Sequence, residues 1–160
     1  MPIRGLLRSA LLLGVAAGAQ NWTLGGKVGL VQRGDKFVPS VALTADCRLN
    51  DRLTWRTDFG AQFTDASDLG HATIHVPTNL LFHPLAGRGA FDPYLGPGLN
   101  YSLDPNRNSL VGANTLVGFM ISPAKSQAFG LEWRWSWLDL VHSTSGQNSL
   151  ALVGRWETQF

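Results

Sequence analysis

The sequence has 160 residues, which suits a single domain, and only one of them is cysteine. A single cysteine excludes a disulfide framework and any zinc or iron–sulfur site built from several cysteines. Charged residues make up 15% of the chain, against the usual quarter or so, and 18 residues are glycine. Lysine and arginine form no cluster, which argues against a nucleic-acid partner. No apolar run of about 18 residues occurs, so a helical membrane span is not expected.

Residues 1–19 have the pattern of a secretory signal peptide. Arg4 and Arg8 make the start positive, an apolar stretch follows, and Ala17-Gly18-Ala19 is a small-residue cleavage site. The alternative is a buried N-terminal helix. Cleavage would remove two of the 13 basic residues and leave the mature chain, residues 20–160 with 11 acidic residues, formally neutral. We therefore expect no basic surface on the mature protein.

The remaining sequence alternates apolar and polar residues in short segments, which is the period of a half-buried β-strand. Each segment is close to the length of about 9–11 residues that a tilted strand needs to cross a bilayer. Eight such segments follow one another in the chain: residues 22–31, 37–49, 53–63, 72–82, 93–103, 110–121, 128–138 and 149–160. The connections predicted to form surface loops are residues 32–36, 64–71, 102–108 and 139–148.

The two faces of these strands differ in a way that favours an inside-out barrel. In the third segment Leu53, Trp55 and Phe59 alternate with Arg56 and Asp58. Bulky aromatic residues collect on the apolar face, and charges and glycines collect on the polar face. Glycine saves room inside a narrow barrel, while aromatic side chains suit lipid and its interfaces. A secreted, lipocalin-like soluble barrel is the alternative with the same number of strands.

The charged residues assigned to the lumen are expected to pair with one another, because a buried unpaired charge costs several kcal/mol. The same alternation places Arg48 among them. The predicted lumen network consists of Lys27, Asp46, Arg56, Asp58, Glu132, Arg134, Arg155 and Glu157.

The outward aromatic residues fall near the two ends of the strands, as in the girdles of an outer-membrane barrel. The predicted girdle consists of Trp22, Trp55, Phe63, Phe82, Tyr101, Trp137 and Trp156. Three prolines interrupt the pattern: Pro39, Pro77 and Pro97 cannot donate to a strand ladder, and we expect β-bulges there.

Two motifs make the chain similar to the small bacterial outer-membrane β-barrel family, which includes the OmpA membrane domain, OmpX-like proteins and porin-like eight-stranded barrels. The last segment, Leu152-Val153-Gly154-Arg155-Trp156-Glu157-Thr158-Gln159-Phe160, ends on phenylalanine with apolar residues at alternate positions. It resembles the family's assembly signal, in which Trp156 and Phe160 are the residues that match and Thr158 departs from the pattern. Val76-Pro77-Thr78-Asn79-Leu80-Leu81-Phe82 followed by Phe91-Asp92-Pro93-Tyr94-Leu95-Gly96-Pro97-Gly98-Leu99 resembles the paired motif of porin-like barrels.

The chain offers no clear catalytic or metal-binding site. Lipid A deacylase-type barrels use a His-x-Ser pair with an acid, and Asp139, His142 and Ser143 supply the residue types but not that spacing on a strand. His71 and His75 share a strand face but lie about 13 Å apart by strand rise, which is too far for one metal ion. No cofactor is expected.

The sequence therefore predicts an all-β protein: an eight-stranded antiparallel up-and-down transmembrane β-barrel, residues 20–160, preceded by a signal peptide. The expected location is the outer membrane, and the expected role is structural or surface-interacting, with a largely plugged polar lumen. A narrow non-specific pore is the alternative, and a lipid-modifying enzyme is a third possibility. Expected partners are outer-membrane lipid, the barrel-assembly machinery and a surface partner that binds the loops.

Overall fold

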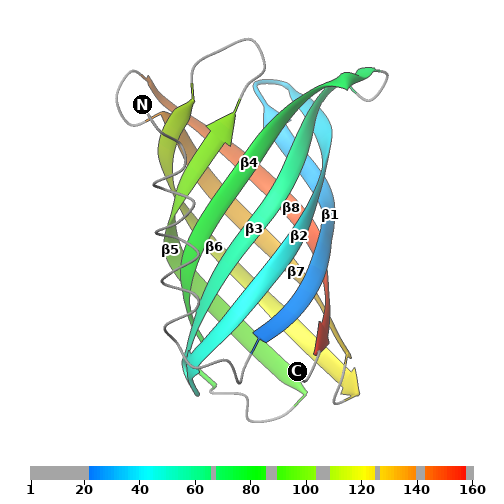
Figure 1. Cartoon of the computed structure of the whole chain (residues 1–160), viewed down its shortest axis with the longest axis vertical. Helices are drawn as coiled ribbons and strands as arrows, with labels where there is room; N and C mark the ends of the chain where they lie inside the picture. Colours follow the sequence, from blue (N-terminus) through cyan, green and yellow to red (C-terminus); the bar gives the residue numbers. More distant parts are fainter. Residues whose placement is uncertain are drawn as a thin grey trace.

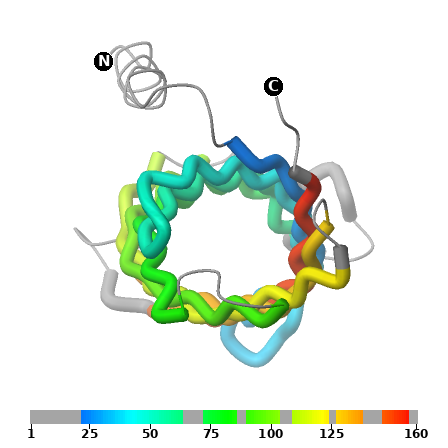
Figure 2. Tube along the Cα trace, turned by 90° about the horizontal axis from the view of Figure 1, so that it is seen from below, coloured from blue at the N-terminus to red at the C-terminus, as the bar shows by residue number. Residues whose placement is uncertain are grey.

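The structure, a computed structural model, describes residues 22–65, 68–85, 90–103, 109–124, 127–139 and 143–157. These residues form one closed sheet in which every strand pairs antiparallel with the next and the last pairs with the first (Figure 1). Seen along its axis the sheet is a closed ring (Figure 2). The strands are β1 (Trp22–Arg33), β2 (Lys36–Asn50), β3 (Leu53–Asp65), β4 (Asp68–Phe82), β5 (Phe91–Leu103), β6 (Leu110–Ala124), β7 (Gln127–Asp139) and β8 (Ser143–Glu157).

The predicted all-β, eight-stranded, up-and-down barrel is confirmed. Among the described residues, no helix is long and apolar enough for a membrane span. The predicted signal peptide, residues 1–19, lies outside the described part of the chain.

The barrel has two ends that we name by the chain. β1 starts and β8 finishes at the terminal end, and the β1–β2 turn lies at the opposite, distal end (Figure 1). That distal turn consists of Gly34 and Asp35, and Gly34 has a φ of 61°. A positive φ is costly for residues with a side chain, so glycine lets two strands meet through two residues.

The strands are longer than predicted, and two of the predicted surface loops are wrong. β4 already begins at Asp68 and β8 at Ser143, so most of residues 64–71 and 139–148 belongs to hairpins. Ladder pairs Asp65↔Asp68 and Asp139↔Ser143 carry the pairing almost to the turns. These stretches show no alternation of apolar and polar residues, because both of their faces are polar. They are nevertheless part of the sheet, because they pair with the neighbouring strands.

The prediction of β-bulges at the prolines is also wrong. Pro39 stays in register with Leu30 on β1, Pro77 with Asn100 on β5, and Pro97 with Thr115 on β6. On their other side Pro77 and Pro97 interrupt the ladder without shifting it, since the pairs one and two residues away keep the same register. A proline lacks one N–H, and that hydrogen bond concerns only one neighbouring strand, so the pairing with the other strand is kept. Register shifts occur nearer strand ends, as between Arg48 and Asn50.

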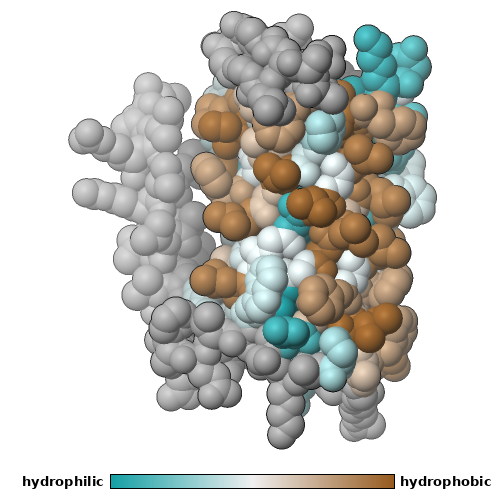
Figure 3. Space-filling model, turned by 90° about the vertical axis from the view of Figure 1, so that its right-hand side faces the viewer, coloured by the Kyte–Doolittle hydropathy of each residue, from teal (hydrophilic) through white to brown (hydrophobic). Residues whose placement is uncertain are grey.

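Apolar side chains cover the outside of the barrel, and polar side chains fill the inside. Phe59 is 60% exposed and Trp133 54%, whereas Arg56 is 0% and Glu132 3% exposed. Figure 3 shows hydrophobic side chains over much of the described surface on one face. In water such a surface would be unfavourable, because soluble proteins rarely expose apolar patches beyond a few hundred Å².

Candidate functional site in the barrel lumen

Side chains from five strands meet in the middle of the lumen as a network of ion pairs. Lys27 on β1 donates to Asp58 on β3 and to Glu132 on β7, with both distances 2.7 Å. Arg134 donates to the same two carboxylates, at 2.5 Å from Asp58 and 3.1 Å from Glu132. These pairs cross the barrel from β1 to β3 and β7.

Arg56 connects this group to a second carboxylate. It donates through Nε and Nη2 to Asp46, its register partner on β2, and through Nη1 to Glu132 at 2.6 Å. Arg155 on β8 lies 2.9 Å from Asp46. A two-pronged arginine–carboxylate pair of this kind is directional as well as strong.

Tyr94 on β5 completes the network and was missed in the sequence analysis. Its hydroxyl donates to Glu132 at 3.2 Å, and its ring lies 4.9 Å from the guanidinium carbon of Arg56. Tyr94 appeared only within the motif shared with porin-like barrels. Strand parity was the available signal, because Tyr94 stands two positions from Gly96 on the lumen face.

Of the predicted network residues, seven take part in ion pairs in the structure: Lys27, Asp46, Arg56, Asp58, Glu132, Arg134 and Arg155. Glu157 lies at the end of β8, in register with Thr23, and its side chain is outside the described part. Placing Arg48 in the lumen group was wrong. It is exposed at the terminal end and donates to the carbonyls of Asn50 and Asp51, because the strand ends there and the lumen opens.

The distal half of the lumen holds neutral polar side chains. Asn79 donates to Asn114, which donates at 2.9 Å to Asn100, so three amides brace β4, β5 and β6. His75 Nδ1 lies 2.8 Å from the hydroxyl of Ser102. Buried amides and hydroxyls need such partners in a dry interior.

The terminal half of the lumen also contains an apolar cluster, which the predicted largely plugged polar lumen did not include. Five side chains that are at most 2% exposed pack together there: Leu81, Tyr94, Leu116, Met120 and Val153. The alternation did not predict this cluster, because apolar residues were assigned to the outside. Next to Tyr94, His83 pairs with Asp92 at 2.9 Å and joins β4 to β5 at this end.

The predicted girdle residues divide between the two ends of the barrel. Trp22, Trp55, Phe82 and Trp156 stand near the terminal end of their strands, and Phe63, Tyr101 and Trp137 stand near the distal end. Trp55, Phe82 and Trp156 are exposed, and the other four are half-buried. Cys47, also on the outward face, is buried, and its register partners are Trp22 and Trp55.

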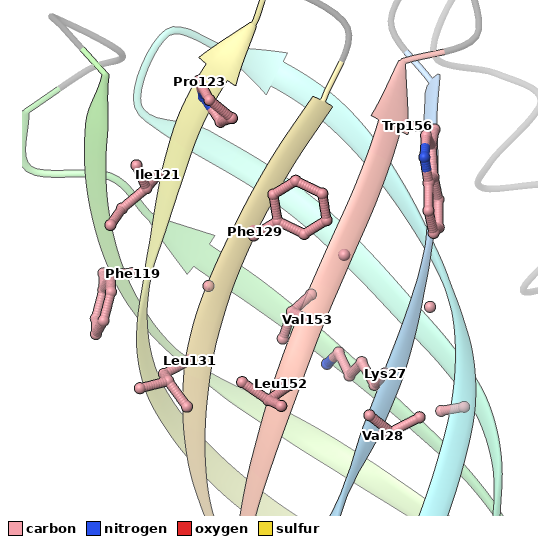
Figure 4. A pocket seen from close by; sticks show the side chains of 14 residues that line it. Lys27, Val28, Phe119, Ile121, Pro123, Phe129, Leu131, Leu152, Val153 and Trp156 are labelled. Carbon is pink, nitrogen blue, oxygen red and sulfur yellow. The ribbon is translucent and has the colours of Figure 1, made fainter.

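An open apolar hollow of about 820 Å³ lies on the barrel wall formed by β6, β7, β8 and β1 (Figure 4). Gly26 and Gly154 are register partners at this wall, so two adjacent strands lack an outward side chain there. Phe129, Leu152 and Trp156 stand around the hollow (Figure 4).

The structure leaves several predicted residues undescribed. Phe160 and His142 lie outside the described part, and so do the side chains of Asp139 and Ser143. Among described residues, no group of three or more His, Cys, Asp or Glu side chains could hold a metal ion.

No protein-family model matches this sequence, and no curated protein sequence matches it. Solved structures do match. The chain is similar to Neisserial surface protein A (NspA), with 15% identity, a TM-score of 0.67 and coverage of 86% of this chain and 96% of NspA. This fold is that of the small outer-membrane β-barrels.

Two further solved structures are similar to this chain in fold. The N-terminal β-barrel domain of Pseudomonas aeruginosa OprF has 10% identity and a TM-score of 0.64, with coverage of 84% of this chain and 96% of that domain. The outer membrane enzyme PagL has 13% identity and a TM-score of 0.59, with coverage of 85% of this chain and 99% of PagL. One fold thus serves a surface protein and an enzyme, so the fold alone does not assign an activity.

Proposed function

We propose that this chain is an integral outer-membrane protein whose sealed barrel has a structural or surface-interacting role in the cell envelope. The observation that carries the proposal is the difference between the outer and the inner face of the barrel. Large apolar side chains stand outside, while a cross-barrel ion-pair network and an apolar layer fill the lumen. Lipid is the solvent in which the outer face is stable.

We place the terminal end in the periplasm, where a chain delivered by a cleaved signal peptide, residues 1–19, would begin its first strand. Trp156 and Phe160 would then act as the signal to the barrel-assembly machinery. Acyl chains would fill the hollow beside Gly26 and Gly154.

Cell fractionation with a heated and an unheated gel sample tests the membrane proposal. We expect the protein in the outer-membrane fraction, with a faster-migrating unheated band, and a mature mass that begins at Gln20. Recovery in the soluble periplasmic fraction with no change in mobility on heating would contradict the proposal.

A narrow pore is disfavoured because eight strands leave a lumen that side chains nearly fill. Leu81, Leu116 and Met120 add an apolar cluster to the lumen, which is unfavourable for the passage of ions. We therefore propose that the barrel does not conduct.

A lipid-modifying enzyme with this fold is the remaining alternative, since PagL shares the fold. We propose that this chain is not an enzyme, because Asp139, His142 and Ser143 lack the spacing of a His-x-Ser pair. Mass spectrometry of envelope lipids from cells with the wild-type protein, His142→Ala and a deletion would test this. Identical lipids in all three are expected, and a modified lipid lost in both mutants would contradict it.

A further inference from the structure

A small polar cavity lies in the distal half of the lumen, above the ion-pair network. It has a volume of about 30 Å³ and lies among β3, β4, β5, β7 and β8. One water molecule or an ion of similar size needs roughly 10–15 Å³ of such space. The cavity therefore has room for one or two small species.

Two nitrogen atoms of its lining side chains lack a hydrogen-bond partner among the described residues. They are Nε of Arg134 and Nε2 of His75, and both are buried. Nδ1 of His75 lies 2.8 Å from the hydroxyl of Ser102. When that hydroxyl donates to Nδ1, the ring hydrogen sits on Nε2. Both free atoms are then N–H donors.

Two amide oxygens that line the cavity already accept hydrogen bonds. Oε1 of Gln62 accepts from Gln147 at 3.3 Å and from Arg33 at 3.5 Å, and Oδ1 of Asn100 accepts from Asn114. No carboxylate is among the residues that line this cavity. His75 and Arg134 also line a neighbouring cavity of about 60 Å³, which Asp58 and Glu132 line as well.

Leaving these two N–H groups without an acceptor in a dry interior is unfavourable, so each of them requires a bound acceptor.

We propose that this cavity binds a single small inorganic anion of chloride size, held between the Arg134 guanidinium and the His75 ring. The anion accepts the two free N–H groups. The hydroxyls of Ser136 and Ser149, which also line the cavity, are further donors. An ordinary buried water molecule is the competing occupant.

Diffraction with bromide in place of chloride separates the two occupants. Crystals of the wild-type barrel grown in sodium bromide and measured at the bromine absorption edge should give an anomalous peak between Arg134 Nε and His75 Nε2. Density without an anomalous signal at that position means water and overturns the proposal.

A solution measurement tests the same site without crystals. The unfolding temperature of the detergent-solubilised barrel is measured in sodium chloride and in sodium gluconate at equal ionic strength. Wild type should unfold about 3 °C higher or more in chloride. His75→Leu should remove this difference, since it deletes one donor and leaves Arg134 in place.

His83→Leu is the matched control. His83 is the other histidine that is buried among the described residues, but it lies at the terminal end of the barrel, away from the cavity. It should keep the difference between chloride and gluconate. A difference that survives in His75→Leu, or that is absent in wild type, overturns the proposal.

Discussion

Glu132 is the residue on which the lumen network converges. Its two oxygens accept from Lys27, Arg56, Arg134 and Tyr94 at distances between 2.6 and 3.2 Å. Three cations of the network therefore share this one carboxylate, and each of them has one further carboxylate partner, Asp46 or Asp58. Removing one partner from a buried pair is far more costly than the net stabilisation that the pair provides, because the other charge remains desolvated.

We accordingly expect Glu132→Gln to lower the free energy of unfolding by about 3–5 kcal/mol. Urea titration of the barrel folded in lipid vesicles, followed by tryptophan fluorescence, measures this. Asp92→Asn is the control: its partly exposed pair with His83 should contribute less than about 1 kcal/mol. Adding Lys27→Met to Glu132→Gln should recover part of the loss, and full additivity of the two losses would contradict the coupling.

Gly118 shows why the lumen face carries glycine. It is the register partner of Tyr94, and a Cβ on it would lie 2.7 Å from the ring carbon Cζ and the hydroxyl of that tyrosine. The missing side chain makes room for the ring that contacts Arg56.

Gly118→Ala should therefore destabilise the barrel by about 1–3 kcal/mol through overpacking. Gly26→Ala is the matched control, because the nearest atom to its added Cβ is a carbonyl oxygen at 3.9 Å. The same urea titration compares them. Equal stability of the two variants would mean that Tyr94 can move aside without loss.

At the scale of the strand, β6 offers two valines with the same exposure at different heights. Val117 is 52% exposed near the middle of the strand, and Val111 is 53% exposed near its distal end. If the barrel were in water, a charged side chain would have the same effect on stability at both positions. Across a bilayer they differ, because the cost of a charge falls from the midplane toward the interface.

Val117→Arg should thus destabilise the folded barrel by about 2–4 kcal/mol and Val111→Arg by about 0–1 kcal/mol. Unfolding in urea from lipid vesicles gives both values. Two equal, small effects would indicate that this face meets water, and would argue for the soluble barrel.

β7 carries a row of outward tryptophans beside small neighbours. Trp135 and Trp137 stack with their ring centroids 5.6 Å apart. On β8, Gly146 stands opposite Trp137, and a Cβ at Gly146 would lie 2.8 Å from Nε1 of Trp135. Spacing along one strand predicted the row, but the stacking depends on the missing side chain of the neighbouring strand.

For the whole molecule, the combination of a charged layer and an apolar layer predicts an electrically silent barrel. Purified protein in a planar lipid bilayer should give no current steps at any applied voltage, as expected for a lumen filled by side chains. A preparation of the same detergent without protein serves as the control. Reproducible steps that vanish when the protein is omitted would support the narrow pore instead.

The number of strands and their order could be predicted from the sequence, because alternation has a period of two and hairpins join neighbours. That period places Phe59 and Arg56 on opposite faces, and the gathering of aromatic residues on one face and of charges and glycines on the other predicted which face points outward. Strand ends at Asp68 and Ser143 could not be predicted this way, since residues beyond the apolar pattern are held only by their neighbours in the ladder.

Only the tertiary structure determines which of the inward-facing charged side chains form ion pairs. Lys27 and Glu132 are 105 positions apart in the chain, and only closure of the sheet brings them within 2.7 Å. The same closure places Leu81, Leu116 and Met120 against Tyr94 in the terminal half of the lumen. Alternation specifies the face that a side chain occupies, but the curvature and register of the closed sheet specify which side chains face each other across it.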